Sequence, residues 1–387
     1  MSAPEPVPAP LSPVSLTPAA LTAASLTPDD LAAVPPAVAP RLRGAHRVLA
    51  VCHEHPEADA LGAVLALAIA LEQFGIRVTP VCADPVPAMY AFMPGIDRMR
   101  TAPDPAGDYD LLVVVDCGEL ERVGAVLPAF ADLFARVPIV NIDHHVSNTG
   151  FGEIDWIDTE AAATCEMLTL LVRVLGVPLT AGGGTLAATL LAGIVMDTAT
   201  FQHPNATPRT LRAAAELVAA GAPLSDLARL LYRTKPEGQL RLFGRVLARM
   251  ESDLDGRLLW SDLLESDLAA PGTIGAQSEG LIDLMSQSEM AQIALLFKEE
   301  PGRTRVSVRT RDGGPDATTL VGIFGGGGHA RAAGATVCAG LEAARRDVLE
   351  AARRLIRGEA IAAEIALDEA VPRDVIRGDV IPGEGAG

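Results

Sequence analysis

The chain has 387 residues and a formal charge of −18, from 31 Lys and Arg against 49 Asp and Glu side chains. This length suffices for two ordinary domains, and a composition of 49% hydrophobic and 21% charged residues excludes a mostly disordered protein. The acidic balance disfavours binding to long nucleic acid, and 4% aromatic residues are too few for an extended base-stacking channel. A phosphate-bearing substrate would therefore be small, or held by metal ions and a few arginines.

Cysteine use and hydropathy indicate the compartment. The five cysteines are scattered without a C-x-x-C pair, which is typical of reduced thiols. The N-terminus has no basic segment followed by an apolar stretch, and the longest apolar run, residues 63–71, is far shorter than the roughly 18 residues of a membrane span. We expect a cytoplasmic protein that does not associate with membranes.

The first part of the chain has the pattern of a parallel α/β domain. We expect a flexible Pro/Ala-rich tail over residues 1–25 and a helix over 26–42 that is capped by Thr27. Short apolar runs predict buried strands at residues 47–52, 111–115 and 137–142, and a further strand is expected around residues 76–82. Helices are predicted at residues 59–74, 160–175, 185–196, 208–220 and 224–231. Strands that alternate with helices predict a parallel sheet in a domain over residues 26–232.

A smaller, mixed α/β domain is predicted after a helical connector at residues 233–252. Its strands are expected at residues 257–261, 291–297 and 303–310, and its helices at 277–285, 316–324 and 341–357. We place this domain at residues 253–357. An acidic tail follows at residues 358–387.

Ionisable side chains follow the predicted strands directly. The first strand is followed by His53, Glu57 and Asp59, and the third by Asp116. The fourth strand leads into Asp143, His144 and His145, while Asp197 ends a helix. Because sites in open parallel sheets form beyond the carboxyl ends of the strands, we expect these groups to meet at one edge.

Imidazoles and carboxylates without a thiolate suit Mn²⁺, Mg²⁺ or Fe²⁺ better than a structural zinc. The candidate ligands are too many for one ion, which favours two metals about 3.5–4 Å apart that would clamp a phosphoryl group. Each group alone is equally explained as a helix cap or a loop residue. Their presence at three strand ends makes a shared site the better interpretation.

A glycine run in the smaller domain is a second candidate site. Gly325-Gly-Gly-Gly-His329 precedes a helix-compatible alanine run, and such a segment can form a backbone nest for an anion. Alone, the run is as typical of a flexible turn. Arg309 at the end of a predicted strand is suited to forking onto a phosphate. Together they predict a second phosphate contact.

These motifs resemble the DHH phosphoesterase superfamily. His53-x-x-Pro56-Glu57-x-Asp59, Asp116, Asp143-His144-His145 and Asp197 match its four motifs in order, and the glycine run with Ala332-Ala-Gly334 resembles the signature of the DHH-associated substrate-binding domain. The resemblance covers about residues 45–357. The compact layout is similar to the nanoRNase/pAp-phosphatase branch, which degrades very short oligoribonucleotides and dephosphorylates 3′-phosphoadenosine 5′-phosphate (pAp).

The resemblance implies a hydrolase in which a hydroxide formed at two divalent ions, Mn²⁺ or alternatively Mg²⁺, attacks phosphorus. It implies a first ion held by His53, Glu57 and Asp116, and a second held by Asp59, Asp116, His144 and Asp197. Asp143 would orient the neighbouring histidine, and His145 would contact the scissile phosphate. The substrate's far end would be received by Arg309, Gly326, Gly327, Gly328 and His329.

Two positions depart from the family pattern, because Glu57 stands where Asp is usual and Gln202 where a basic residue is common. We expect His55 and His203 to be exposed loop residues.

The substrates would be short oligonucleotides or small nucleotide phosphates, bound between the domains. The sequence is compatible with a homodimer.

Other functions stay open. A pApA or cyclic-dinucleotide phosphodiesterase belongs to the same class. A RecJ-like single-strand DNA exonuclease is disfavoured by the few aromatics and by the lack of room for an extra domain. An inorganic pyrophosphatase would lack the glycine-rich ending. The last alternative is a regulator that binds nucleotides but no metal, and Glu57 is the only feature that favours it.

Overall fold

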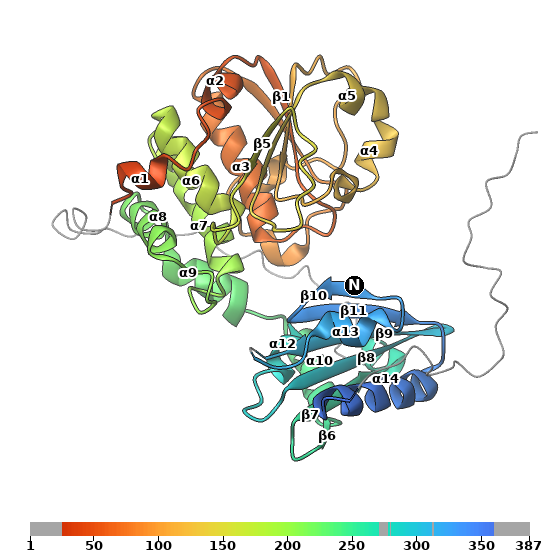
Figure 1. The fold of residues 1–387 in the computed structure, drawn as a ribbon. Coiled ribbons are helices and arrows are strands. Elements are labelled where there is room, and N and C mark those ends of the chain that lie inside the picture. The colour runs from red at the N-terminus through yellow and green to blue at the C-terminus, as the bar shows by residue number, and fades with distance from the viewer. Residues whose placement is uncertain (1–24, 271–277, 279, 312, 360–387) are drawn as a thin grey trace, which may run out of the picture. The chain divides into compact units, whose positions relative to one another are not determined.

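The computed structural model describes residues 25–270, 278, 280–311 and 313–359, and the chain divides into two compact units, Met1–Thr234 and Lys235–Gly387 (Figure 1). The tails expected at residues 1–25 and 358–387 lie almost wholly outside the described residues. Within the described ranges, no helix combines the length and the apolar character needed to cross a bilayer.

The first unit is built on a five-stranded parallel sheet with the order β2-β1-β3-β4-β5. Its strands are β1 (Arg47–Val51), β2 (Arg77–Val81), β3 (Leu111–Val115), β4 (Ile139–Asp143) and β5 (Ile154–Ile157). The first four confirm the predicted strands. The prediction missed β5, because this edge strand buries only Trp156 and so has no continuous buried run. The order reverses at β1 and β3, which is where open sheets of this kind bind ligands.

Helices cover both faces of this sheet (Figure 1). Alternate strand residues point to opposite faces, so Val48 and Ala50 join the core with α3, α6 and α7, whereas Leu49 and Val51 face α4 and α5. The helices of the unit are α1 (Pro28–Leu31), α2 (Val38–Arg43), α3 (Ala58–Glu72), α4 (Val126–Ala129), α5 (Ala131–Arg136), α6 (Thr164–Leu175), α7 (Thr185–Asp197), α8 (Pro208–Ala219) and α9 (Leu224–Ala228). Short 3-10 turns lie at Ala88–Tyr90, Ile96–Arg98, Leu120–Val123 and Ala181–Gly184, and a π-helical turn at Arg229–Arg233 follows α9.

One expected helix, at residues 26–42, is two short ones. Thr27 caps α1 as predicted, with its hydroxyl accepting from the amide of Asp30. The helix ends before Pro35 and Pro36, because a proline disfavours helical backbone in the residue before it and removes a donor. The segment resumes as α2.

The second unit contains a six-stranded mixed sheet with the order β10-β11-β9-β8-β7-β6. Its strands are β6 (Glu251–Asp253), β7 (Leu258–Leu263), β8 (Ile293–Glu300), β9 (Arg303–Thr310), β10 (Gly327–His329) and β11 (Ala332–Val337). α13 (Ala317–Gly322) and α14 (Leu341–Ile356) cover one face, and α10 (Glu237–Leu247) and α12 (Leu281–Met285) cover the other; α11 (Glu265–Leu268) is a single turn. Because Leu242, Phe243 and Val246 of α10 pack against β7 and α12, the helix expected in the connector belongs to the core of this unit.

The alanine run after the glycines is a strand, so the helix-compatible interpretation is wrong. β11 pairs antiparallel with β9 and β10, and its alternate residues Ala333, Ala335 and Val337 are buried. Alternation on a pleated surface outweighs the helical preference of alanine here, because the segment is fixed between two partner strands.

The contact between α3 and α7 is close enough to require glycine. Every residue of α3 from Ala58 to Leu71 is buried, which makes it the central helix of the unit. A Cβ added at Gly62 would lie 2.9 Å from the carbonyl oxygen of Thr189 and 3.0 Å from the sulfur of Cys165.

We expect Gly62→Ala to destabilise the protein by about 1–3 kcal/mol through overpacking, although alanine favours helix. The matched control is Gly244→Ala in α10, where a Cβ meets nothing within 4 Å. That change should stabilise its helix by up to about 1 kcal/mol. Calorimetric unfolding of both variants measures the two signs, and stabilisation by Gly62→Ala would contradict the close packing.

Candidate metal centre

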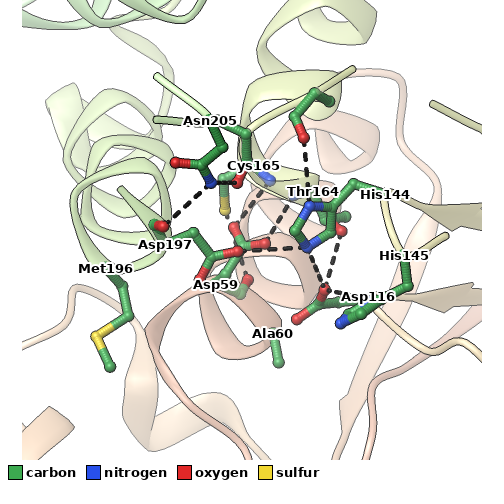
Figure 2. Close-up of polar contacts among 12 residues, drawn as sticks. Asp59, Ala60, Asp116, His144, His145, Thr164, Cys165, Met196, Asp197 and Asn205 are labelled. Carbon is green, nitrogen blue, oxygen red and sulfur yellow. Dashed lines mark hydrogen bonds and ion pairs between the residues drawn. The ribbon is translucent and has the colours of Figure 1, made fainter. Parts of the chain in front are cut away.

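The ionisable residues predicted to meet do so at the carboxyl edge of the parallel sheet. Figure 2 shows five of them, Asp59, Asp116, His144, His145 and Asp197. His53 follows β1, Asp116 follows β3 directly, and β4 ends in Asp143 before His144 and His145. Asp59 lies in the first turn of α3, and Asp197 is the last residue of α7. Their potential ligand atoms form three groups, each within 4.8 Å: His53, Glu57 and Asp116; Asp59, His144 and Asp197; Asp116, Asp143, His144 and His145.

Asp116 stands at the centre of the cluster. Its Oδ2 lies 3.5 Å from Nε2 of His53, and its Oδ1 lies 3.4 Å from Nε2 of His144. The hydroxyl of Thr164 donates to the same Oδ1 at 3.1 Å. The backbone of Asp116 is left-handed, with φ 56°, a conformation that Asp tolerates better than most residues. This turn directs one carboxylate toward both histidines.

Both histidines present Nε2 to the cluster because Nδ1 contacts a backbone carbonyl. Nδ1 of His53 lies 2.6 Å from the oxygen of Glu54, and Nδ1 of His144 lies 3.3 Å from that of Ala161. A proton held on Nδ1 leaves Nε2 as the coordinating nitrogen. Nε2 of His144 also lies 3.3 Å from Oδ2 of Asp197.

Asp59 is fully buried and held by the amino end of α6. The amides of Thr164 and Cys165 donate to its two carboxylate oxygens at 2.7 and 2.9 Å. A helix amino terminus stabilises a carboxylate through these free amides and its partial positive charge. Gly193 of α7 makes room, because a Cβ there would lie 2.4 Å from Oδ1 of Asp59.

The carboxylate of Glu57 makes two kinds of contact, one with the start of α3 and one with His53. It is the N-cap of α3, where its carboxylate accepts from the amides of Asp59 and Ala60, each at 3.0 Å. The same carboxylate lies 3.8 Å from Nε2 of His53. A carboxylate offers about four acceptor directions, so capping leaves capacity for a cation.

Asp143 orients His145 rather than facing solvent. It is buried, and its Oδ1 lies 2.7 Å from Nδ1 of His145 and accepts from the amide of His144 at 2.9 Å. Its Oδ2 accepts from the amide group of Asn148 at 2.6 Å. With Nδ1 engaged, His145 retains Nε2 for another partner.

Burial and crowded like charges shift the pKa values of the acids. Burial, with the charges of Asp116 and Glu57, raises the pKa of Asp59 to about 7. Burial and the charge of Asp59 raise the pKa of Asp197 well above its usual range. For Asp116, burial opposes ionisation, but hydrogen bonds from His144 and His53 outweigh it and hold the pKa well below the usual range.

The histidines shift in the opposite sense. Burial opposes their charge, but the Asp116 contact raises the pKa of His53 to about 10, with help from Glu57, and that of His144 to about 9. The protons therefore balance an excess of buried negative charge. Divalent cations would replace them, since metal binding to such groups releases protons.

Several supporting residues were missed by sequence reasoning. Thr164, Cys165, Asn148 and the carbonyl of Ala161 hold Asp59, Asp116, Asp143 and His144. Three of the four contact the site through backbone groups or at a helix start, which no residue type announces. His55 and His203 are exposed loop residues, as expected.

The predicted phosphate-contacting residues lie in the second unit. Nε of Arg309, near the end of β9, donates to Oδ1 of Asp283 in α12 at 2.6 Å. In β10, Gly327 pairs with Gly334 of β11. Two of the glycines have a steric reason: a Cβ would lie 2.3 Å from the oxygen of Gly334 at Gly326, and 2.6 Å from the oxygen of Ala332 at Gly328, where φ is 141°.

Comparison with known proteins gives consistent matches. The model described as the DHH family, N-terminal domain, matches residues 47–221, and the DHHA1 domain matches residues 267–358. The chain is 34% identical over 306 residues to the bifunctional oligoribonuclease and PAP phosphatase NrnA of Thermus thermophilus, covering 78% of this chain and 87% of the relative. It is 29% identical over 300 residues to the protein of the same name from Bacillus subtilis, covering 76% and 90%.

A solved structure shares the fold. The exopolyphosphatase-related protein from Bacteroides fragilis superposes with a TM-score of 0.73 at 22% identity, covering 82% of this chain and 93% of that one. The parallel sheet followed by a mixed sheet is therefore an architecture already seen in an experimental structure.

We expect the free energy of unfolding of the metal-free protein to fall as the pH rises from 6.5 to 10. The raised pKa values of about 10 for His53 and about 9 for His144, against 6.5, mean that the folded state binds more protons than the unfolded chain in this window. Their contribution is complete below pH 6.5 and is lost through pH 9–10. The raised pKa of Asp59 adds a fall of the same sign up to about pH 7.

Urea unfolding in EDTA at several pH values measures this slope. His144→Gln should make this slope shallower between pH 7 and 9, because glutamine at position 144 cannot bind the proton that His144 loses over this range, while His53 still contributes. A stability that rises over this window in the wild-type chain would contradict the charge balance of the cluster.

Proposed function

The chain belongs to the DHH family, and from this membership we propose that it is a metal-dependent phosphoesterase that hydrolyses very short oligonucleotides and converts pAp to AMP. The cluster of imidazoles and carboxylates at the reversal of the sheet carries this proposal. The two curated relatives named as bifunctional oligoribonuclease and PAP phosphatase support the substrate class.

The cluster offers enough ligand atoms for two divalent ions, most suitably Mn²⁺. We assign His53, Glu57 and Asp116 to one ion, and Asp59, Asp116, His144 and Asp197 to the other. Nitrogen and oxygen donors without a thiolate favour Mn²⁺ or Mg²⁺, and Asp116 is the only one of these groups near both histidines through separate oxygens. When bound, such a pair of ions activates water and neutralises charge on a phosphoryl group.

The remaining groups would act on the substrate. Asp143 keeps the proton of His145 on Nδ1, so that Nε2 can contact the scissile phosphate. In the second unit, we assign Arg309, Gly326, Gly327, Gly328 and His329 to the far end of the substrate. The planar fork of an arginine suits a terminal phosphate.

A cytoplasmic location agrees with the five cysteines, all of which are free. Homodimer formation stays a prediction from the sequence.

We expect Asp116→Asn to lower turnover of pAp by more than about 100-fold, because one neutral amide replaces a carboxylate shared by both proposed ions. Asn tolerates the left-handed backbone at this position, so the fold should persist. AMP release from pAp in Mn²⁺, with circular dichroism of the variant, is the measurement. Retention of a tenth of wild-type turnover would contradict the shared role.

A substrate panel in the same assay separates this activity from its rivals. We expect mononucleotides from RNA of two to five nucleotides and AMP from pAp. Preferential cleavage of cyclic dinucleotides, of longer single-stranded DNA or of pyrophosphate would favour the respective alternative. Hydrolysis of none of them in Mn²⁺ would favour a nucleotide-binding regulator.

We expect Arg309→Ala to raise KM for pAp and dinucleotides by one to two orders of magnitude, since a charge-assisted contact is worth about 1.5–3 kcal/mol. Cleavage of a small activated phosphodiester should change little. The matched control is Arg303→Ala on the same strand, which removes an exposed ion pair with Glu300. An equal loss of activity on both kinds of substrate would exclude a role of Arg309 in binding the far end of the substrate.

A further inference from the structure

The segment 158–166 contacts ligands of both proposed ions. The carbonyl of Ala161 faces His144, the amides of Thr164 and Cys165 hold Asp59, and the hydroxyl of Thr164 holds Asp116 (Figure 2). The placement of this segment therefore sets the placement of three side chains in the cluster.

A buried ion pair between Glu166 and Arg209 joins segment 158–166 to α8. Glu166 has no exposed surface; its Oε2 accepts from the amide of Ala162 at 3.0 Å, and its Oε1 accepts from Nε of Arg209 at 2.6 Å. Arg209, in α8, also lies 2.9 Å from Oδ2 of Asp158 through Nη1. The hydroxyl of Thr210 donates to Oε2 of Glu166 at 2.7 Å. One guanidinium thus joins both ends of the segment to α8.

Stability alone does not account for this arrangement. Removing charges from water is costly, and a buried ion pair is often replaceable by apolar side chains without loss of stability. What the planar guanidinium does provide is a fixed geometry, because its fork binds carboxylates in defined directions. Metal ligands need placement within about 0.5 Å, which supporting contacts supply.

We propose that Arg209 and Glu166 are positioning residues of the metal centre, which act through segment 158–166 to set the affinity for divalent cations. This inference rests on the proposed function only in that the cluster binds Mn²⁺. Neither residue belongs to the ligand set, and neither touches substrate in this assignment.

The chain offers a matched control three residues further along α8. Arg212 donates through Nε and Nη2 to the two oxygens of Asp30 at 2.8 and 2.7 Å, and Asp30 is 8% exposed. This pair joins α8 to α1, and within the described part of the chain neither of its side chains hydrogen-bonds to segment 158–166. It is the same kind of Arg–carboxylate pair as Arg209 with Glu166, although its arginine is more exposed, 30% against 15%, and its carboxylate does not hydrogen-bond to segment 158–166.

The test measures Mn²⁺ binding to the full-length chain directly, by the electron paramagnetic resonance signal of free Mn²⁺. We expect Arg209→Met and Glu166→Gln to raise the Mn²⁺ dissociation constant about 10- to 100-fold. Arg209→Lys keeps the charge but loses the fork, and should fall between wild type and Arg209→Met. Arg212→Met should leave Mn²⁺ binding within about twofold of wild type, whatever its effect on urea unfolding.

Kinetics add a second readout. The pAp phosphatase activity of Arg209→Met should recover when Mn²⁺ is raised, but not when pAp is raised. Wild-type Mn²⁺ affinity in both Arg209→Met and Glu166→Gln would overturn the proposal, as would an equal loss in Arg212→Met. A wild-type chain that binds Mn²⁺ but hydrolyses nothing in the panel would refute the proposed function and leave the positioning role measurable. A wild-type chain that binds no Mn²⁺ would overturn both.

Discussion

Asp59, Asp116 and Asp197 come within reach of two histidines in a largely buried space, and burying unpaired charge is among the costliest events in folding. The surrounding structure is organised to offset this cost. The amino end of α6 supplies amides, a threonine supplies a hydroxyl, and protonated imidazoles supply positive charge. The close packing of α3, α6 and α7, which needs Gly62 and Gly193, leaves room for Asp59 beside those amides. The packing of the helices thus supplies the groups that stabilise the buried carboxylates of the site.

The two ion pairs on α8 illustrate how similar interactions serve different ends. The pair of Arg212 and Asp30 joins the short helix α1 to α8. The pair of Arg209 and Glu166 instead holds segment 158–166, whose residues contact the candidate metal ligands. Both are arginine–carboxylate pairs, but Arg209 contacts two carboxylates, and Glu166 also accepts a hydrogen bond from the amide of Ala162, whereas the other hydrogen bonds of Asp30 lead to Thr27. The tertiary contacts around a charge, rather than the charge itself, therefore decide whether it bears on function.

Glu57 shows how a departure from a family pattern can be accommodated. Its longer side chain folds back onto the first turn of α3, where it accepts two amides while staying near His53. A carboxylate in that position stabilises the helix that carries Asp59. The longer side chain therefore lets one carboxylate cap α3 and still lie 3.8 Å from Nε2 of His53.

The sequence by itself determined β1, β3 and β4 and the residues that follow them, because a buried parallel strand is a short apolar run whose carboxyl end faces the site. It did not determine β5, which is half exposed, or β10 and β11, whose glycines and alanines have no strand preference of their own. Nor did it reveal the roles of Thr164, Cys165 and Arg209. Their hydrogen bonds join residues 43 to 106 positions apart, and the close approach of such residues arises only when the helices pack against the sheet.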